Sequence, residues 1–135
     1  MRILGIDLGK RRIGLALGDT VSRIAIGLPT IINDRTVPDN IQSIIRSEKI
    51  QRLVVGLPKT LSGKSGDQAA YTQKWAQRLS ELLGVEVVYE DERLSSRLAR
   101  EGLVAIGQQL SKEDIDQAAA VLILQSYLDR NYGVD

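Results

Sequence analysis

Apolar residues in the first quarter of the chain occur in short runs of β-type character. Residues 3–6 and 13–17 form two such runs, separated by the turn-like stretch 9–12. This arrangement predicts a β-hairpin. Residues 24–32 are again apolar and β-branched and end at the Asn33-Asp34 turn signal, so we expect a third antiparallel strand.

The pattern then changes to helical spacing. Thr36 and Asp39 have the spacing of a capping box, and Pro38 suits the first helical turn, so a helix is predicted to run through Glu48. Residues 53–56 form an unbroken apolar run, which is typical of a strand buried on both faces, and Pro58 ends it.

A polar, glycine-containing loop leads into a second predicted helix. Tyr71, Trp75, Leu79 and Leu82 form its apolar stripe, and Gly84 is a helix-terminating residue. Residues 85–89 are rich in valine and predict a fifth strand.

The last third of the chain is expected to be helical at both of its ends. A short helix is predicted from Leu94 to about Glu101, and residues 102–110 are ambiguous. Ser111 and Asp114 then have capping-box spacing before a long apolar helix over 112–130.

Three antiparallel strands followed by two strand–helix alternations predict an α/β fold. Parallel strands need crossover connections, and both crossovers here are helical. We therefore expect a five-stranded mixed sheet in the order 3-2-1-4-5 with helices on both faces. The length of 135 residues suits a single domain over residues 1–135.

Composition excludes several kinds of chemistry. The chain has no cysteine and no histidine, so thiol nucleophiles, structural zinc sites and Ser-His triads are unavailable. The net charge of +1 does not demand a polyanionic partner, and nucleic-acid affinity would have to come from local basic patches. Without cysteine, a signal-peptide pattern or an apolar run longer than Ala118–Leu124, we expect a soluble cytoplasmic protein with no membrane partner.

One acid stands inside the apolar first strand. Asp7 would be costly to bury as an ion unless it is paired or bound to a cation, which makes it a candidate site residue. The alternative, given even weight, is that Asp7 caps the following glycine turn.

Two further acids could lie near Asp7. Asp116 shares a helical stripe with small and apolar residues, so its side chain should face the sheet. Residues 90–92 are all acidic and follow the fifth strand, and one of them should turn inward where the carboxyl ends of the parallel strands meet. Glu113 and Asp114 are better explained as first-turn acids favoured by the helix dipole.

Four segments together resemble the YqgF (RuvX) family of Holliday-junction-resolvase-like proteins, which are also regarded as nucleases of the small-subunit ribosomal RNA precursor. The segments are GIDLGKRRIGLAL around Asp7, VVGLP followed by SGKSG at 54–66, DERLSSRLA at 91–99, and DIDQAAAVLILQSYL at 114–128. They occur in family order along nearly the whole chain. Within the mid-chain loop, Ser62 stands where family members usually have an aspartate.

The resemblance implies a ribonuclease H-like fold and a catalytic, metal-binding set of Asp7, Glu92 and Asp116. Carboxylate oxygens suit Mg²⁺ or Mn²⁺, and such ions support phosphodiester hydrolysis without histidine. Basic residues next to these acids and in the mid-chain loop are candidate phosphate contacts: Lys10, Arg11, Arg12, Lys59, Lys64, Arg93 and Arg97.

The predicted function is therefore a metal-dependent endonuclease, acting on the 5′ end of the 16S ribosomal RNA precursor or on branched DNA, in the latter case as a homodimer. One alternative is a non-catalytic nucleic-acid-binding module of the same fold. An ATP-dependent phosphotransferase is a third hypothesis, because the strand–turn motif around Asp7 occurs in kinase-like ATPases. Those enzymes close two lobes over the nucleotide, which this short chain cannot build.

Overall fold

A computed structural model describes residues 1–58, 66–92 and 111–133 of the chain. Its five strands form one sheet in the order β3-β2-β1-β4-β5, as predicted. The strands are β1 (Arg2–Leu8), β2 (Arg12–Asp19), β3 (Ala25–Ile32), β4 (Ile50–Leu57) and β5 (Glu86–Asp91). The first three strands pair antiparallel, whereas β4 runs parallel to both β1 and β5. The first strand therefore lies at the centre of a mixed sheet.

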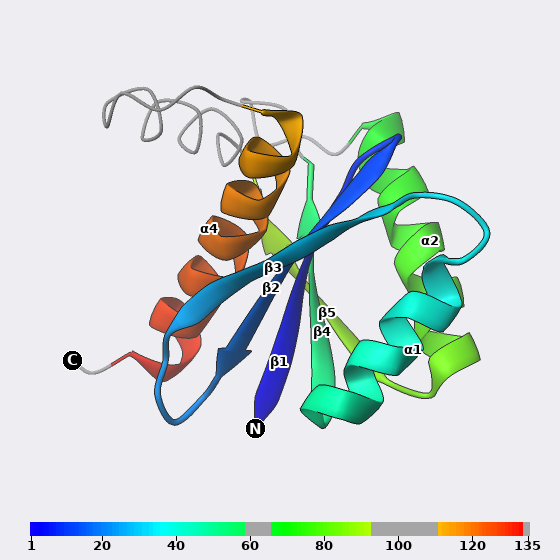
Figure 1. The fold of residues 1–135 in the computed structure, drawn as a ribbon. Coiled ribbons are helices and arrows are strands. Elements are labelled where there is room, and N and C mark those ends of the chain that lie inside the picture. Colours follow the sequence, from blue (N-terminus) through cyan, green and yellow to red (C-terminus); the bar gives the residue numbers. More distant parts are fainter. Residues whose placement is uncertain (59–65, 93–110, 134–135) are drawn as a thin grey trace.

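Helices cover both faces of this sheet (Figure 1). The helices α1 (Val37–Glu48) and α2 (Asp67–Leu83) lie side by side on one face, and α4 (Lys112–Tyr132) lies on the other. The predicted short helix over 94–101 and the ambiguous stretch 102–110 lie outside the described residues. In the part of the chain that is described, no helix is long and apolar enough to cross a membrane.

The two predicted capping boxes have different outcomes. At α4, the Ser111 hydroxyl accepts from the Asp114 amide at 3.0 Å, and the Asp114 carboxylate accepts from the Ser111 amide. At α1, Thr36 is the N-cap residue but makes no capping hydrogen bond, so the predicted box with Asp39 was wrong. The Thr36 hydroxyl instead donates to the Asp34 carboxylate at 2.5 Å and accepts from the side-chain amide of Asn40 at 3.1 Å.

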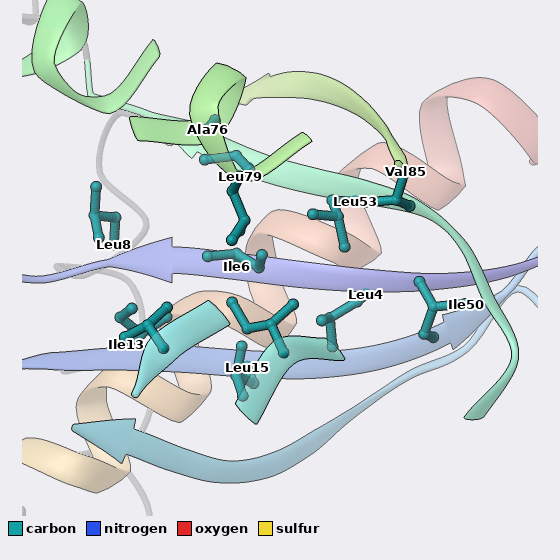
Figure 2. Packing of buried hydrophobic residues seen from close by; sticks show 13 residues of the cluster. Leu4, Ile6, Leu8, Ile13, Leu15, Ile50, Leu53, Ala76, Leu79 and Val85 are labelled. Carbon is teal, nitrogen blue, oxygen red and sulfur yellow. The ribbon is translucent and has the colours of Figure 1, made fainter. Parts of the chain in front are cut away.

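Alternate residues of β1 supply the two cores. Leu4, Ile6 and Leu8 point toward α1 and α2, where they pack with residues of the neighbouring strands (Figure 2). Ile3 belongs to the second core, beneath α4. Because strand side chains alternate between faces, Asp7 lies on the α4 face.

Glycine positions in the strands let α4 approach the sheet closely. A Cβ atom on Gly14 of β2 would lie 2.1 Å from the backbone oxygen of Asp116, and one on Gly5 of β1 would lie 2.8 Å from the Cβ of Leu124. Any side chain at Gly14 would force the helix outward. These positions therefore set how near Asp116 comes to the sheet.

The inward face of α2 differs from the predicted stripe. Its buried residues are small or medium in size: Ala69, Thr72, Ala76 and Leu79. Trp75 is only half-buried against the core, while Tyr71 is 57% exposed and Leu82 is 68% exposed. The predicted end of the helix is confirmed, because Gly84 has a left-handed conformation with φ 65° and its amide donates to the Ser80 carbonyl.

Candidate active site

Asp7 lies near the carboxyl end of the central strand, at the edge where the parallel strands β4 and β5 also end. Its side chain is on the α4 face and Asp7 is only 9% exposed. Glu92 follows β5 directly, and its amide donates to the Leu57 carbonyl at the end of β4. Gly56 leaves the space that the Glu92 side chain occupies, because a Cβ atom there would lie 2.6 Å from the Glu92 Oε2.

The carboxyl groups of Asp7 and Glu92 share a hydrogen bond. Burial raises the pKa of Glu92 to about 9, and the hydrogen bond with Asp7 and the negative charges of Asp7 and Asp91 act in the same direction. Burial also raises the pKa of Asp7, with the charge of Asp116 adding to it and the hydrogen bond to Glu92 opposing it. One proton held between two carboxyl groups explains this pattern, because two adjacent buried carboxylates repel each other.

Asp116 reaches the same neighbourhood from α4. Its carboxylate oxygen Oδ2 accepts from the Arg12 Nε at 3.2 Å, an ion pair in which both side chains are about three-quarters covered. Arg12 begins β2, so this pair ties the first turns of α4 to the hairpin. Of the three acids predicted as a site, Asp7 and Glu92 share a hydrogen bond, whereas Asp116 contacts Arg12 and affects Asp7 through its charge.

Glu90 of β5 turns inward as well as Glu92, whereas only one inward acid was expected among residues 90–92. It is 3% exposed, accepts from the Ser126 hydroxyl at 2.9 Å and forms an ion pair with Arg130. Both of these partners belong to α4, so Glu90 links the helix to the sheet. The period-two spacing of Glu90, in β5, and Glu92, directly after it, was the available sequence signal.

The basic turn next to Asp7 is held by Asn33, a residue that sequence reasoning placed only in a turn. The Asn33 side-chain amide donates to the Gly9 carbonyl at 2.7 Å, and its backbone amide donates to the Arg11 carbonyl at 2.8 Å. Lys10 and Arg11 are exposed in this turn. The other predicted phosphate contacts, Lys59, Lys64, Arg93 and Arg97, lie outside the described residues.

The donor set at this edge consists of carboxylate oxygens, which fit Mg²⁺ or Mn²⁺ and not a soft metal. The acids are not arranged as a finished metal cage: within residues 1–58, 66–92 and 111–133, no three potential ligands are grouped closely enough to hold an ion. A cation bound between Asp7 and Glu92 would replace the shared proton and neutralise the negative charge of the two carboxylates. The carboxyl groups of these two residues therefore fit a divalent ion, and the charge of Asp116 acts on Asp7 beside them.

Comparison with known proteins gives a family match over nearly the whole chain. A family model described as "RuvX: Holliday junction resolvase" matches residues 1–130. The chain belongs to the RuvX family. A RuvX relative from Sulfurihydrogenibium, named "Putative pre-16S rRNA nuclease", is 42% identical over 131 residues, covering 96% of this chain and 90% of its own. A relative of the same name from Bacillus cereus is 40% identical over 136 residues, covering 96% of this chain and 99% of its own.

Solved structures support the RuvX fold assignment. The RuvC resolvase of T. thermophilus in complex with a Holliday junction aligns with a TM-score of 0.56 at 15% identity, over 98% of this chain and 96% of that one. The fowlpox virus resolvase aligns with a TM-score of 0.58 at 12% identity, over 96% and 98%. The fold is therefore that of the ribonuclease H-like resolvases. Family membership makes the protein a nuclease, an enzyme that hydrolyses phosphodiester bonds.

Proposed function

We propose that this RuvX protein is a metal-dependent endonuclease that processes the 5′ end of the small-subunit ribosomal RNA precursor. The observation that carries the proposal is the pair of facing, buried carboxyl groups of Asp7 and Glu92 at the carboxyl ends of the parallel strands, with the charge of Asp116 acting on Asp7. The relatives named for precursor ribosomal RNA are about 40% identical to this chain, whereas the junction resolvases are 12–15% identical. This difference favours RNA as the substrate.

In the proposed mechanism, Asp7, Glu92 and Asp116 would hold a divalent ion, and Asp7 and Glu92 would give up the proton that they share. Bound Mg²⁺ or Mn²⁺ would supply an activated water and charge stabilisation for the departing oxygen. The burial of Asp7 excludes bulk water from one side of the site and strengthens its interaction with charge.

Arg12 has two tasks in this proposal. Its Nε holds the Asp116 carboxylate, which fixes the direction of that ligand, while the outer nitrogens of the guanidinium group can donate to a phosphate. Lys10 and Arg11 project from the adjacent exposed turn. Contacts of this kind position a backbone without reading its sequence.

The test is a cleavage assay that offers precursor ribosomal RNA ends, single-stranded RNA and four-way junction DNA side by side. Cleavage of the RNA precursor should require Mg²⁺ or Mn²⁺, disappear with a chelator and be poorly supported by Zn²⁺, which prefers nitrogen and sulfur ligands. Asp116→Asn should abolish cleavage. Glu113→Gln is the matched control, because it neutralises an exposed acid on the same helix turn and should leave cleavage unchanged.

The other outcomes each overturn a definite part of the proposal. Full activity in excess chelator would eliminate the metal-dependent mechanism. Binding of nucleic acid without cleavage under any metal condition would make the chain a non-catalytic binding module. Paired cuts in the junction by a dimer, with the RNA precursor left intact, would replace RNA processing with junction resolution.

A further inference from the structure

A groove on the opposite side of the sheet from α4 has no role in the proposed chemistry. It has a volume of about 450 Å³ and lies between the start of α1 and the outer face of α2. Tyr71, Trp75 and Leu82 line it with apolar surface, and these are the residues of the α2 stripe that the sheet leaves uncovered. Val37 and Leu79 are buried and form its floor.

The charges of the groove are unbalanced. Arg35, Lys74 and Arg78 line it and are exposed, and none of the three is paired with an acid in the part of the chain that the structure describes. The one acid in the lining, Asp34, already accepts from the amide and hydroxyl of Thr36. A polyanion would neutralise this excess of positive charge.

The groove adjoins a second hollow at Tyr71, next to the turn that follows β1. A smaller hollow of about 300 Å³ is lined by Leu8, Gly9 and Lys10 at the end of β1 and by Gln68 and Tyr71 of α2. Tyr71 therefore lines both hollows. From Tyr71 to Leu82 the helix extends about 16 Å at 1.5 Å per residue, so the lining leads away from the strand end that carries Asp7.

We propose that this groove binds a single-stranded flank of the nucleic-acid substrate, with bases stacked on Tyr71 and Trp75 and phosphates held by Arg35, Lys74 and Arg78. Aromatic rings beside unpaired cations are the combination that single-stranded nucleic acids use, because every base has a face that can stack. A second copy of the chain fits the groove less well, because a two-fold contact would bring three unpaired cations from each copy together. This assignment extends the proposed nuclease function, which supplies the substrate.

Trp75 is the only tryptophan in the chain, so its fluorescence reports on the groove directly. The experiment titrates a single-stranded oligonucleotide into the protein with a chelator present, which separates binding from cleavage. RNA and DNA forms of the oligonucleotide are compared, and an abasic oligomer of equal length carries the phosphates without the bases. Both base-containing oligomers should quench Trp75, and the abasic oligomer should bind more weakly without quenching it.

Variants separate stacking from charge. Tyr71→Ala should weaken binding about fivefold or more, as expected for a lost base stack, while Tyr71→Phe should retain wild-type affinity. In a plot of the logarithm of the binding constant against the logarithm of the salt concentration, Arg78→Ala should make the slope shallower by about 0.7. This is the value for one phosphate contact on a single strand. Arg46→Ala, at an exposed arginine of α1 outside the groove, should leave the slope unchanged.

Two results would overturn the assignment while leaving the proposed nuclease function intact. Binding detected by anisotropy with no change in Trp75 fluorescence and no effect of Tyr71→Ala would place the nucleic acid elsewhere. A Trp75 signal that follows protein concentration, with a dimer lost in Leu82→Asp, would assign the groove to a second copy. Quenching by the oligonucleotide in a protein that cuts nothing would instead support the groove and refute the nuclease proposal.

Discussion

In the metal-free protein, Glu92→Gln should reduce the loss of stability that occurs as the pH rises. The Glu92 carboxyl has a pKa of about 9 in the folded protein, against an ordinary value of 4.5. Between these values the folded state keeps a proton that the unfolded state has released. The stabilising contribution of this proton is therefore fully present below pH 4.5 and is lost as the pH rises toward 9.

The size of this effect is limited by the single proton involved. The free energy of unfolding should fall by at most about 1.4 kcal/mol per pH unit, or about 2.7 kcal/mol between pH values of about 5.5 and 7.5. Glutamine keeps the shape of the side chain and can donate to the Asp7 carboxylate, but it does not titrate. The raised pKa of Asp7 acts in the same direction, so the variant should show a shallower slope and not a flat line.

The assay is urea unfolding at a series of pH values with a chelator present. Glu113→Gln serves as the control, because it removes an exposed acid and should reproduce the wild-type slope. If Glu92→Gln and the wild type lose stability equally as the pH rises, the shared proton does not exist, and the contact between Asp7 and Glu92 is not the basis of the site.

Three further substitutions test the surroundings of the site. Gly14→Ala places a methyl group against the Asp116 carbonyl, so it should destabilise the protein by about 1–3 kcal/mol, as overpacking does, and reduce cleavage by displacing Asp116; urea unfolding and initial rates measure both. Arg130→Ala leaves the buried Glu90 carboxylate with one partner and should cost about 1–3 kcal/mol in urea unfolding, below the value for a fully buried pair because Arg130 is exposed. Arg12→Ala should weaken nucleic-acid binding without sequence preference and lower the salt slope by about one unit, as measured by anisotropy at several salt concentrations.

Controls for these variants lie elsewhere in the described chain. Gly66→Ala meets no atom within 4 Å and should not destabilise the protein by overpacking. Arg46→Ala removes an exposed arginine remote from the site and should keep the wild-type salt slope. A Gly14→Ala protein as stable as Gly66→Ala would show that α4 does not rest on the sheet at this glycine, and an unchanged slope in Arg12→Ala would make Arg12 a structural partner of Asp116 alone.

The sheet order could be predicted because it depends on hydrophobic alternation, turn residues and helical connections, all of which can be identified in the sequence. Alternation and turn residues predict the hairpin, and the helical connections before and after β4 permit its parallel pairing with β1 and β5. Asp7 and Asp116 were identifiable for a related reason, since each is a charge within an apolar pattern. Such positions carry a desolvation cost that only a partner removes.

Other features depend on contacts that a pattern does not encode. The acidic run 90–92 gave no means of separating Glu90 from Glu92, because both point to the same face and only α4 supplies Ser126 and Arg130 to the first of them. The stripe of α2 was misjudged because the helix packs through small residues at Ala69 and Ala76. Large apolar side chains dominate a hydrophobic pattern, yet close packing selects for small ones.

Thermal unfolding of the wild type and Asp7→Asn, with and without Mn²⁺ at fixed ionic strength, tests the central claim most directly. A cation that binds only the folded state should stabilise the wild type by roughly 2.7 kcal/mol at a hundredfold excess over its dissociation constant. Without metal, Asp7→Asn should be as stable as the wild type or more so, because it relieves a buried carboxyl group beside Asp116, and it should lose most of the gain from Mn²⁺. An Asp7→Asn protein that is less stable without metal and gains as much with it would show that Asp7 is a turn cap and no metal ligand.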